Sequence, residues 1–75
     1  MSFDLVSLGD LIRMLSAGGV LELSVAGRNV GDMVRLASAA NGGNGGLILS
    51  GLGERPIGDY VRIASAGGGK VTLKW

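Results

Sequence analysis

The sequence predicts an α/β fold of three α-β repeat units, with a three-stranded parallel sheet in the order 1-2-3 and all helices on one face. One observation is a ten-residue segment that occurs three times, as LGDLIRMLSA at 8–17, VGDMVRLASA at 30–39 and IGDYVRIASA at 57–66. The other is that glycines follow each copy, and then a short segment in which apolar and less apolar residues alternate. A unit repeated in this way stacks on its neighbours, because one unit alone cannot bury its apolar face. We therefore expect a single domain over residues 1–75, with units at about 7–25, 29–50 and 56–75.

The three copies have the apolar pattern of amphipathic helices. Apolar residues recur at i, i+3, i+4 and i+7, which places them along one stripe of a helix. The stripes are Leu8, Leu11, Ile12 and Leu15 in the first copy, Val30, Met33, Val34 and Ala37 in the second, and Ile57, Tyr60, Val61 and Ala64 in the third.

Residues typical of helix ends flank each copy. Ser7 and Asn29, each with an aspartate three residues later, have the form of capping boxes, and Pro56 suits a first helical turn. The glycines that follow can supply the left-handed residue that ends a helix. The segment NGGNGG at 41–46 is predicted to be a flexible link, longer than the other two helix-strand turns. Close approach of its backbone to a ligand is the alternative.

Three short strands are expected after the helices, at 20–25, 47–50 and 70–75. In each, leucine or valine alternates with a mostly polar set, so only one face is uniformly apolar. Strands joined by helices run parallel, and the order 2-1-3 would place helices on both faces, so the alternation favours the order 1-2-3. The predicted core consists of Leu11, Ile12, Leu21, Leu23, Val34, Leu47, Leu49, Val61, Val71 and Leu73.

The stretch LELSVAGRNVGDMVRLASA at 21–39 resembles a leucine-rich repeat of the ribonuclease-inhibitor type, and LILSGLGERPIGDYVRIASA at 47–66 is similar. That family has a strand L-x-L-S, a turn with asparagine, and then Gly-Asp and an alanine-rich helix. The positions of the family's ladder asparagine hold Ala26 and Leu52 in this chain. The resemblance implies a stack of helices and strands with a polar inner sheet face, and it implies no particular ligand. A compact α/β sandwich without horseshoe curvature is the alternative.

The composition argues against several classes of function. The net charge is +1 and each aromatic residue type occurs once, which indicates neither a nucleic-acid partner nor a membrane-surface partner. The chain has no cysteine and no histidine, which removes disulfides, the usual zinc sites and the usual general base. We expect no catalytic residues, no metal and no cofactor. Hydrophobic residues make up 47% of the chain, which is more than so small a protein readily hides.

The chain is expected to be cytoplasmic and not to span a membrane. Its first ten residues, MSFDLVSLGD, contain an aspartate and lack the basic start of a signal peptide. The most apolar window, residues 5–25, contains Asp10, Arg13 and Glu22, which argues against a membrane span.

The favoured function is a non-enzymatic protein-protein interaction or self-assembly module that forms a homo-oligomer, a dimer or larger. The sheet face without helices would present Ile48, Thr72 and Lys74, and a protein partner or a second copy would cover it. Open sheet edges also template pairing with another chain. Trp75, at the end of the last strand, belongs to the candidate interface, although its parity with Val71 and Leu73 favours packing against the third helix.

The alternative function is binding of a small anionic ligand, a nucleotide or a phosphate, at the turn GLGERP (51–56). This turn follows a strand, precedes a helix and is a degenerate form of G-x-G-x-x-G, with Gly51, Gly53 and Arg55 as candidate binding residues. A plain tight turn is the structural alternative. Each of the three copies also has an aspartate and, three residues later, an arginine. We interpret the aspartates as helix-capping residues and the arginines as their i+3 neighbours on a solvated face. The alternative is that these charged side chains form a row on adjacent helices that binds an anion or a partner.

Overall fold

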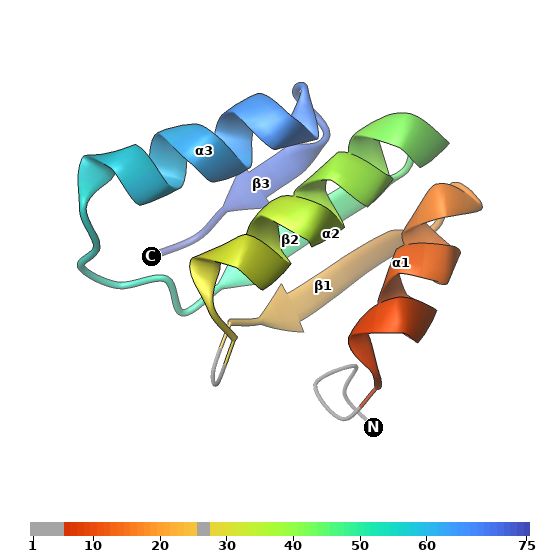
Figure 1. Cartoon of the computed structure of the whole chain (residues 1–75), viewed down its shortest axis with the longest axis horizontal. Helices are drawn as coiled ribbons and strands as arrows, with labels where there is room; N and C mark the ends of the chain where they lie inside the picture. Colours follow the sequence, from red (N-terminus) through yellow and green to blue (C-terminus); the bar gives the residue numbers. More distant parts are fainter. Residues whose placement is uncertain (1–5, 26–27) are drawn as a thin grey trace.

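A computed structural model describes residues 6–25 and 28–75, in which three helices alternate with three strands (Figure 1). The first helix-strand pair lies at one end of the molecule and the third pair at the other. The elements in chain order are α1 (Leu8–Ser16), β1 (Val20–Ser24), α2 (Val30–Gly43), β2 (Gly46–Ser50), α3 (Ile57–Gly67) and β3 (Val71–Leu73).

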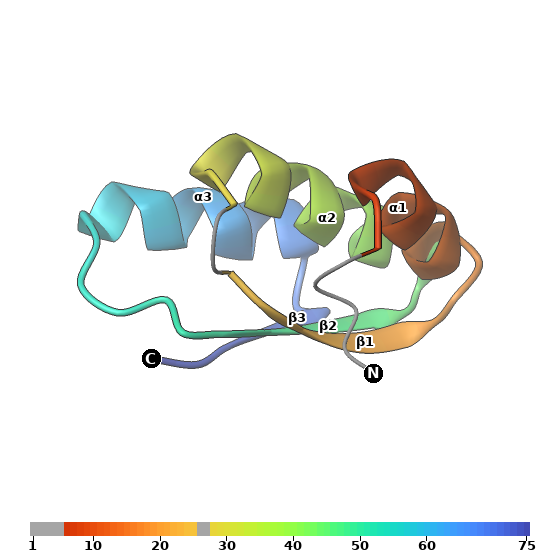
Figure 2. The same ribbon diagram turned by 90° about the horizontal axis from the view of Figure 1, so that it is seen from below.

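The three strands form one parallel sheet in the order β1-β2-β3, as the alternation predicts. Leu21 of β1 is in register with Leu47 of β2, which is in register with Val71 of β3. All three helices lie on the same side of the sheet (Figure 2). The predicted fold class is confirmed, and its physical reason is that only the leucine-bearing face of the strands is apolar enough to be buried under helices.

The predicted caps of the first two helices are present. The backbone N–H of Asp10 donates to Ser7 Oγ at 3.3 Å, and that of Asp32 donates to Asn29 Oδ1 at 2.8 Å. Each bond satisfies an amide that has no partner inside its helix. Pro56 occupies the residue just before α3 and makes no side-chain hydrogen bond, because its ring carries no acceptor.

Replacing Asn29 by alanine is expected to lower the free energy of unfolding by about 1 kcal/mol. The change removes the shorter of the two cap hydrogen bonds and leaves the Asp32 amide to water. Asn29 is exposed, so no core packing is lost with it. Urea unfolding followed by circular dichroism measures the loss, and Asn29→Ser, which keeps an acceptor oxygen, is the control. Equal losses in both variants would show that the cap hydrogen bond contributes nothing.

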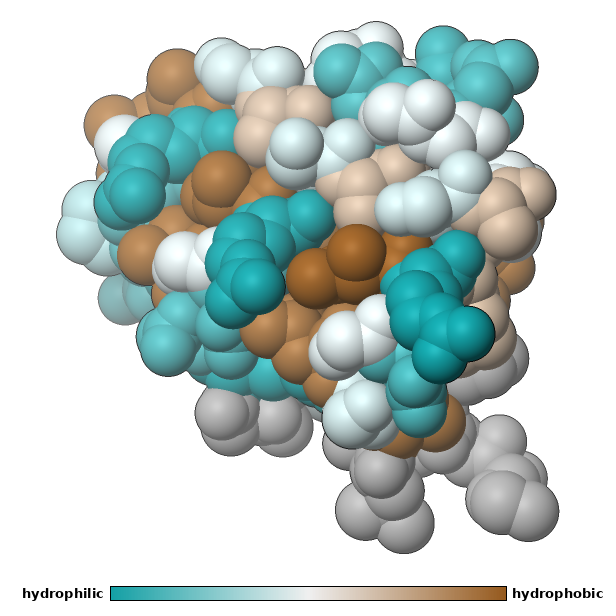
Figure 3. Space-filling model, turned by 45° about the vertical axis from the view of Figure 1, so that its right-hand side comes forward, coloured by the Kyte–Doolittle hydropathy of each residue, from teal (hydrophilic) through white to brown (hydrophobic). Residues whose placement is uncertain are grey.

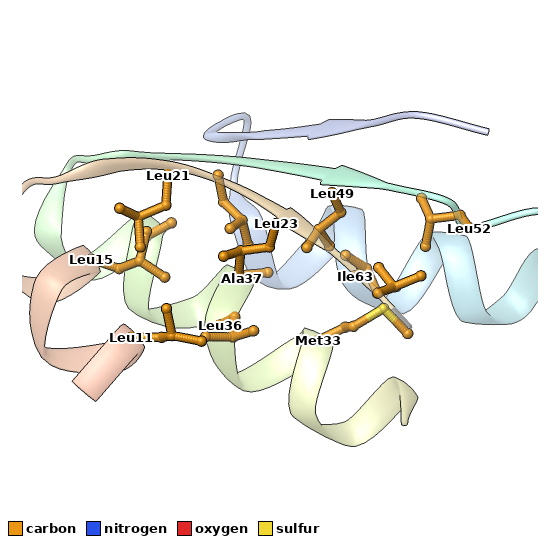
Figure 4. Close-up of a cluster of buried hydrophobic side chains, with 13 residues drawn as sticks. Leu11, Leu15, Leu21, Leu23, Met33, Leu36, Ala37, Leu49, Leu52 and Ile63 are labelled. Carbon is orange, nitrogen blue, oxygen red and sulfur yellow. The ribbon is translucent and has the colours of Figure 1, made fainter. Parts of the chain in front are cut away.

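The core lies between the helices and the face of the sheet that they cover (Figure 4). Among the described residues no polar or charged side chain is buried, so the core is held by apolar packing. The buried apolar residues are Leu11, Leu15, Leu21, Leu23, Val25, Met33, Leu36, Ala37, Ala40, Leu47, Leu49, Leu52 and Ile63.

The predicted core is confirmed for five of its six leucines, and Val61 needs correction. Leu11, Leu21, Leu23, Leu47 and Leu49 are buried, whereas Ile12, Val34, Val71 and Leu73 pack against the core and are only partly buried. Val61 was expected inside and is 56% exposed.

The exposure of Val61 follows from its place on the last helix. Ile12, at the same helix position in the first copy of the ten-residue segment, lies in a groove between α1 and α2. Val61 has no such neighbour, because α3 is the outermost helix of the described residues (Figure 1). The buried residues on α3 are instead Ile63 and Gly67, and Ile63 lies on the side toward α2 and the sheet.

The prediction that the glycine-rich segment 41–46 is a flexible link is also wrong. Its first three residues complete α2, Asn44 ends that helix in the left-handed conformation with φ 56°, and Gly46 begins β2. A Cβ on Gly43 would lie 2.1 Å from the Leu15 carbonyl oxygen, and one on Gly45 would lie 2.3 Å from the carbonyl oxygen of Gly19. The glycines therefore allow the end of α2 to touch the backbone at the end of α1, a tertiary contact that composition alone does not reveal.

Candidate functional site

The side of the sheet opposite the helices forms the open face, and Figure 2 shows that no element of the described residues covers it. Because successive side chains alternate between faces, the strands present to it the residues that do not point into the core. Ile48 lies on the central strand, in register with Glu22 on one side and Thr72 on the other. The open face consists of Val20, Glu22 and Ser24 from β1, Gly46, Ile48 and Ser50 from β2, and Thr72 and Lys74 from β3 and the residues after it.

Polar groups on the open face surround a small apolar centre. Lys74 Nζ lies 3.8 Å from Glu22 Oε2, so this ion pair links β1 to the residue that follows β3, on the far side of the central strand β2. Both side chains are more than half exposed, and such a pair contributes little to stability. A partner that docks on Ile48 can therefore displace the Lys74 side chain at small cost. Val20, 71% exposed, adds apolar surface at the start of β1.

Trp75 was expected to pack against α3, because it alternates in step with Val71 and Leu73, but it does not. Its side chain is 75% exposed, while its backbone oxygen accepts a hydrogen bond from the Gly53 N–H at 3.1 Å. The regular strand ends at Leu73, and beyond that point the alternation of a strand no longer determines where a side chain lies. The candidate interface residue Trp75 is thus on the surface, at the β3 end of the sheet.

The turn at 51–56 is held by hydrogen bonds to the last residues of the chain. The N–H groups of Leu52 and Gly53 donate to the carbonyls of Lys74 and Trp75, at 3.3 and 3.1 Å. Gly51 and Gly53 both have positive φ, 76° and 60°, which explains glycine at these two positions.

Side chains complete the same turn. Arg55 Nε donates to the Leu52 carbonyl at 2.9 Å, and the Tyr60 hydroxyl donates to the Gly53 carbonyl. Gly51, Gly53 and Arg55 lie in this one turn, and the amides of Leu52 and Gly53 bond to the last residues of the chain. The Gly53 amide and the Arg55 Nε therefore already have partners within the protein. An anion site here stays a prediction.

The charged residues of the first helix lie on the solvated side. Arg13 Nη1 is 3.8 Å from Asp10 Oδ1, with exposed fractions of 85% and 62% for the two side chains. This is the i+3 pair expected for a capping residue and its neighbour, and it is weak because water screens both charges. The residues that the structure describes contain no group of acidic side chains that could hold a metal ion. Within residues 6–25 and 28–75, no helix has both the length and the apolar character that crossing a bilayer requires.

Sequence reasoning missed a second exposed apolar surface, at the outer side of α3. Ile57 is 76% exposed and Val61 is 56% exposed, although both belong to the predicted apolar stripe. The signal that identifies them is their position in the last of three copies, since the outermost member of a stack has a neighbour on one side only.

Apolar surface also continues over the other helices. A shallow groove between α1 and α2 is lined by Ile12 and Ser16 from α1 and mainly by Val34, Arg35 and Ala39 from α2. The side of the molecule that carries α1 shows apolar atoms between the polar side chains (Figure 3).

No protein-family model matches the chain, and neither a curated protein nor a solved structure matches it.

Proposed function

We propose that this chain is a non-enzymatic protein-protein interaction and self-assembly module whose partner surface includes the open face of the sheet. The observation that carries the proposal is that the parallel sheet has helices on one side and none of the described elements on the other. Parallel sheets are ordinarily covered on both faces. A second protein surface supplies the missing cover.

The chemistry of the open face suits a protein partner. Ile48 and Val20 offer apolar surface, and Glu22, Thr72 and Lys74 offer charged and hydroxyl groups around it. Protein interfaces have this arrangement, with an apolar centre and a polar rim. Trp75, which follows the open-face residue Lys74 and is exposed, is of a residue type enriched at interfaces. We propose a second copy of the chain as the first partner to test, giving a homo-oligomer.

Ile48→Lys is expected to lower the molar mass of the assembled protein by removing the contacts that copies make through the open face. A lysine at the centre of the open face would be desolvated in any complex that covers it, and the same patch on both copies would be affected in a two-fold dimer. Light scattering or sedimentation at micromolar concentration measures the mass. Removal of Lys74 and Trp75 together is expected to act in the same direction, since it shortens the adjacent edge.

Ser38→Lys is the matched control, because it adds the same charge on the exposed side of α2, on the opposite side of the molecule. Circular dichroism checks that both variants keep the wild-type fold. A wild-type protein that already has the mass of one chain would overturn self-assembly. An assembly that Ile48→Lys leaves intact would remove the open face from the interface.

A further inference from the structure

α1 and α2 meet along a shallow groove to which the two helices contribute partly different positions. Ile12 and Ser16 of α1 line one side of the groove between α1 and α2. The other side is lined from α2 by Val34, Arg35, Ser38, Ala39 and Gly42, of which Arg35 and Ala39 occupy helix positions that α1 does not contribute. The three copies of the ten-residue segment begin at the first residue of α1, α2 and α3, so each position of one helix has a counterpart on the next. The groove therefore has two distinct halves, one contributed by each neighbour.

The two ends of the molecule carry these halves separately. On α3, Val61 and Ser65 have the helix positions that Ile12 and Ser16 have on α1, and both are exposed on a side with no further helix among the described residues. Ile57, one turn earlier, enlarges the same surface. On α1, Arg13 and Ala17 have the positions that Arg35 and Ala39 have on α2. Together with Val6, Asp10 and Met14 they line a shallow hollow on the outer side of α1.

The sheet is open at the same two ends. On β3, the Lys70 carbonyl and the Lys74 N–H bond to β2, at 2.9 and 2.7 Å. Alternation along a strand then directs the backbone groups of Val71 and Leu73 to the free edge. On β1, the same alternation directs those of Glu22 to the opposite free edge. Among residues 6–25 and 28–75, no strand therefore pairs with the outer edge of β3 or with the outer edge of β1.

We propose that copies of this chain stack head to tail, with α3 and β3 of one copy against α1 and β1 of the next. This inference rests on the proposed function, and it specifies a second copy as the partner and the two ends as the surface. The contact continues an arrangement that occurs twice within the chain, between α1 and α2 and between α2 and α3. It covers Ile57 and Val61 and extends the parallel sheet from one copy to the next.

The two surfaces of this contact are different, so the assembly is heterologous and forms rings or filaments, not a two-fold dimer. The stacked register follows from the chain itself. Leu21, Leu47 and Val71 form one row across the three strands, so Val71 of one copy faces Leu21 of the next. Stacking in this way covers the outer surfaces of the first and last units, which a single copy exposes to water.

Cysteine cross-linking of the full chain tests the proposal. The chain has no cysteine, so only introduced thiols react. Ser65→Cys on α3 and Ala17→Cys after α1 replace exposed residues whose counterparts, Ser16 and Ala39, line opposite sides of the internal groove. Mixing the two variants under mild oxidation is expected to give a mixed disulfide dimer, and a chain carrying both changes is expected to give a ladder of multiples of 7.6 kDa.

Three controls decide the outcome. Ser38→Cys, on the exposed side of the central helix, is the matched serine control and is expected to give no mixed dimer with Ala17→Cys. Val61→Lys, added to Ser65→Cys, is expected to abolish the mixed dimer without unfolding the chain, because Val61 is already more than half exposed. Thr72→Cys reports contacts through the open face.

Mixed dimers no more abundant than in the Ser38→Cys control would overturn head-to-tail stacking. If Thr72→Cys then cross-links and Ile48→Lys lowers the mass, the proposed function stands and the copies meet through the open face. If no variant cross-links and the wild-type mass is that of one chain, stacking and self-assembly are both wrong.

Discussion

Truncation of Leu49 to alanine is expected to lower the free energy of unfolding by about 2–5 kcal/mol. Leu49 is fully buried on the central strand, in register with Leu23 on one side and Leu73 on the other. The change removes apolar contact with the helices above and leaves a cavity that the flanking strands cannot close without moving. A domain of this size has a total stability at the low end of about 5–15 kcal/mol, so the loss is a large part of it.

Urea unfolding measures this loss, with Ile48→Ala as the control one residue earlier on the same strand. Ile48 is only partly buried and lies on the open face, so its truncation is expected to cost less. If Leu49→Ala does not fold, Leu49→Val keeps the measurement possible, since it removes one methylene worth about 0.8 kcal/mol. If Leu49→Ala lowered the free energy of unfolding less than Ile48→Ala, the core would have to lie on the Ile48 side of the sheet, which contradicts the structure.

The strand order was predictable because it depends on a local property, the alternation of side chains along each strand. Leu47 and Leu49 face the helices while Ile48 and Ser50 do not, and this one-sidedness excludes helices on both faces. The caps at Ser7 and Asn29 were predictable for the same reason, since their hydrogen bonds span only three residues.

The errors concern properties that depend on neighbours distant in the sequence. Val61 repeats the pattern of Ile12, but a periodic pattern does not say which copy is outermost in the stack. Trp75 continues the parity of β3 beyond the last residue of that strand. Of the candidate site, the open face followed from the strand pattern, whereas the exposed side of α3 required knowledge of the end of the stack.

The composition of the segment 41–46 gave the least accurate picture of its role. Glycine and asparagine are typical of flexible links, and they are equally the residues that permit close backbone contact and left-handed conformations. The structure uses the second property. Gly43 lies against the end of α1, and Asn44 closes α2 with its backbone N–H directed to Asn41 and Ala40 carbonyls.

Adjacent glycines at the end of α2 offer a matched pair in which the same substitution is expected to have opposite effects. Gly42→Ala is expected to leave stability unchanged or raise it by up to about 1 kcal/mol, because a Cβ there meets nothing within 4 Å and alanine favours the helix. Gly43→Ala is expected to lower the free energy of unfolding by about 1–3 kcal/mol or more, the cost of overpacking a well-packed site.

The difference between the two variants arises from one tertiary contact. The added methyl group on Gly43 would lie 2.1 Å from the Leu15 carbonyl oxygen and 2.7 Å from the Ser16 Cα, and both are backbone atoms that cannot rotate away. Relief requires α2 to move from α1, which loosens the packing of Leu15 and Ala40 in the core. Thermal or urea unfolding of the two variants side by side measures the difference. Similar stabilities for Gly42→Ala and Gly43→Ala would mean that the ends of α1 and α2 do not touch, and that 41–46 is the flexible link its composition suggests.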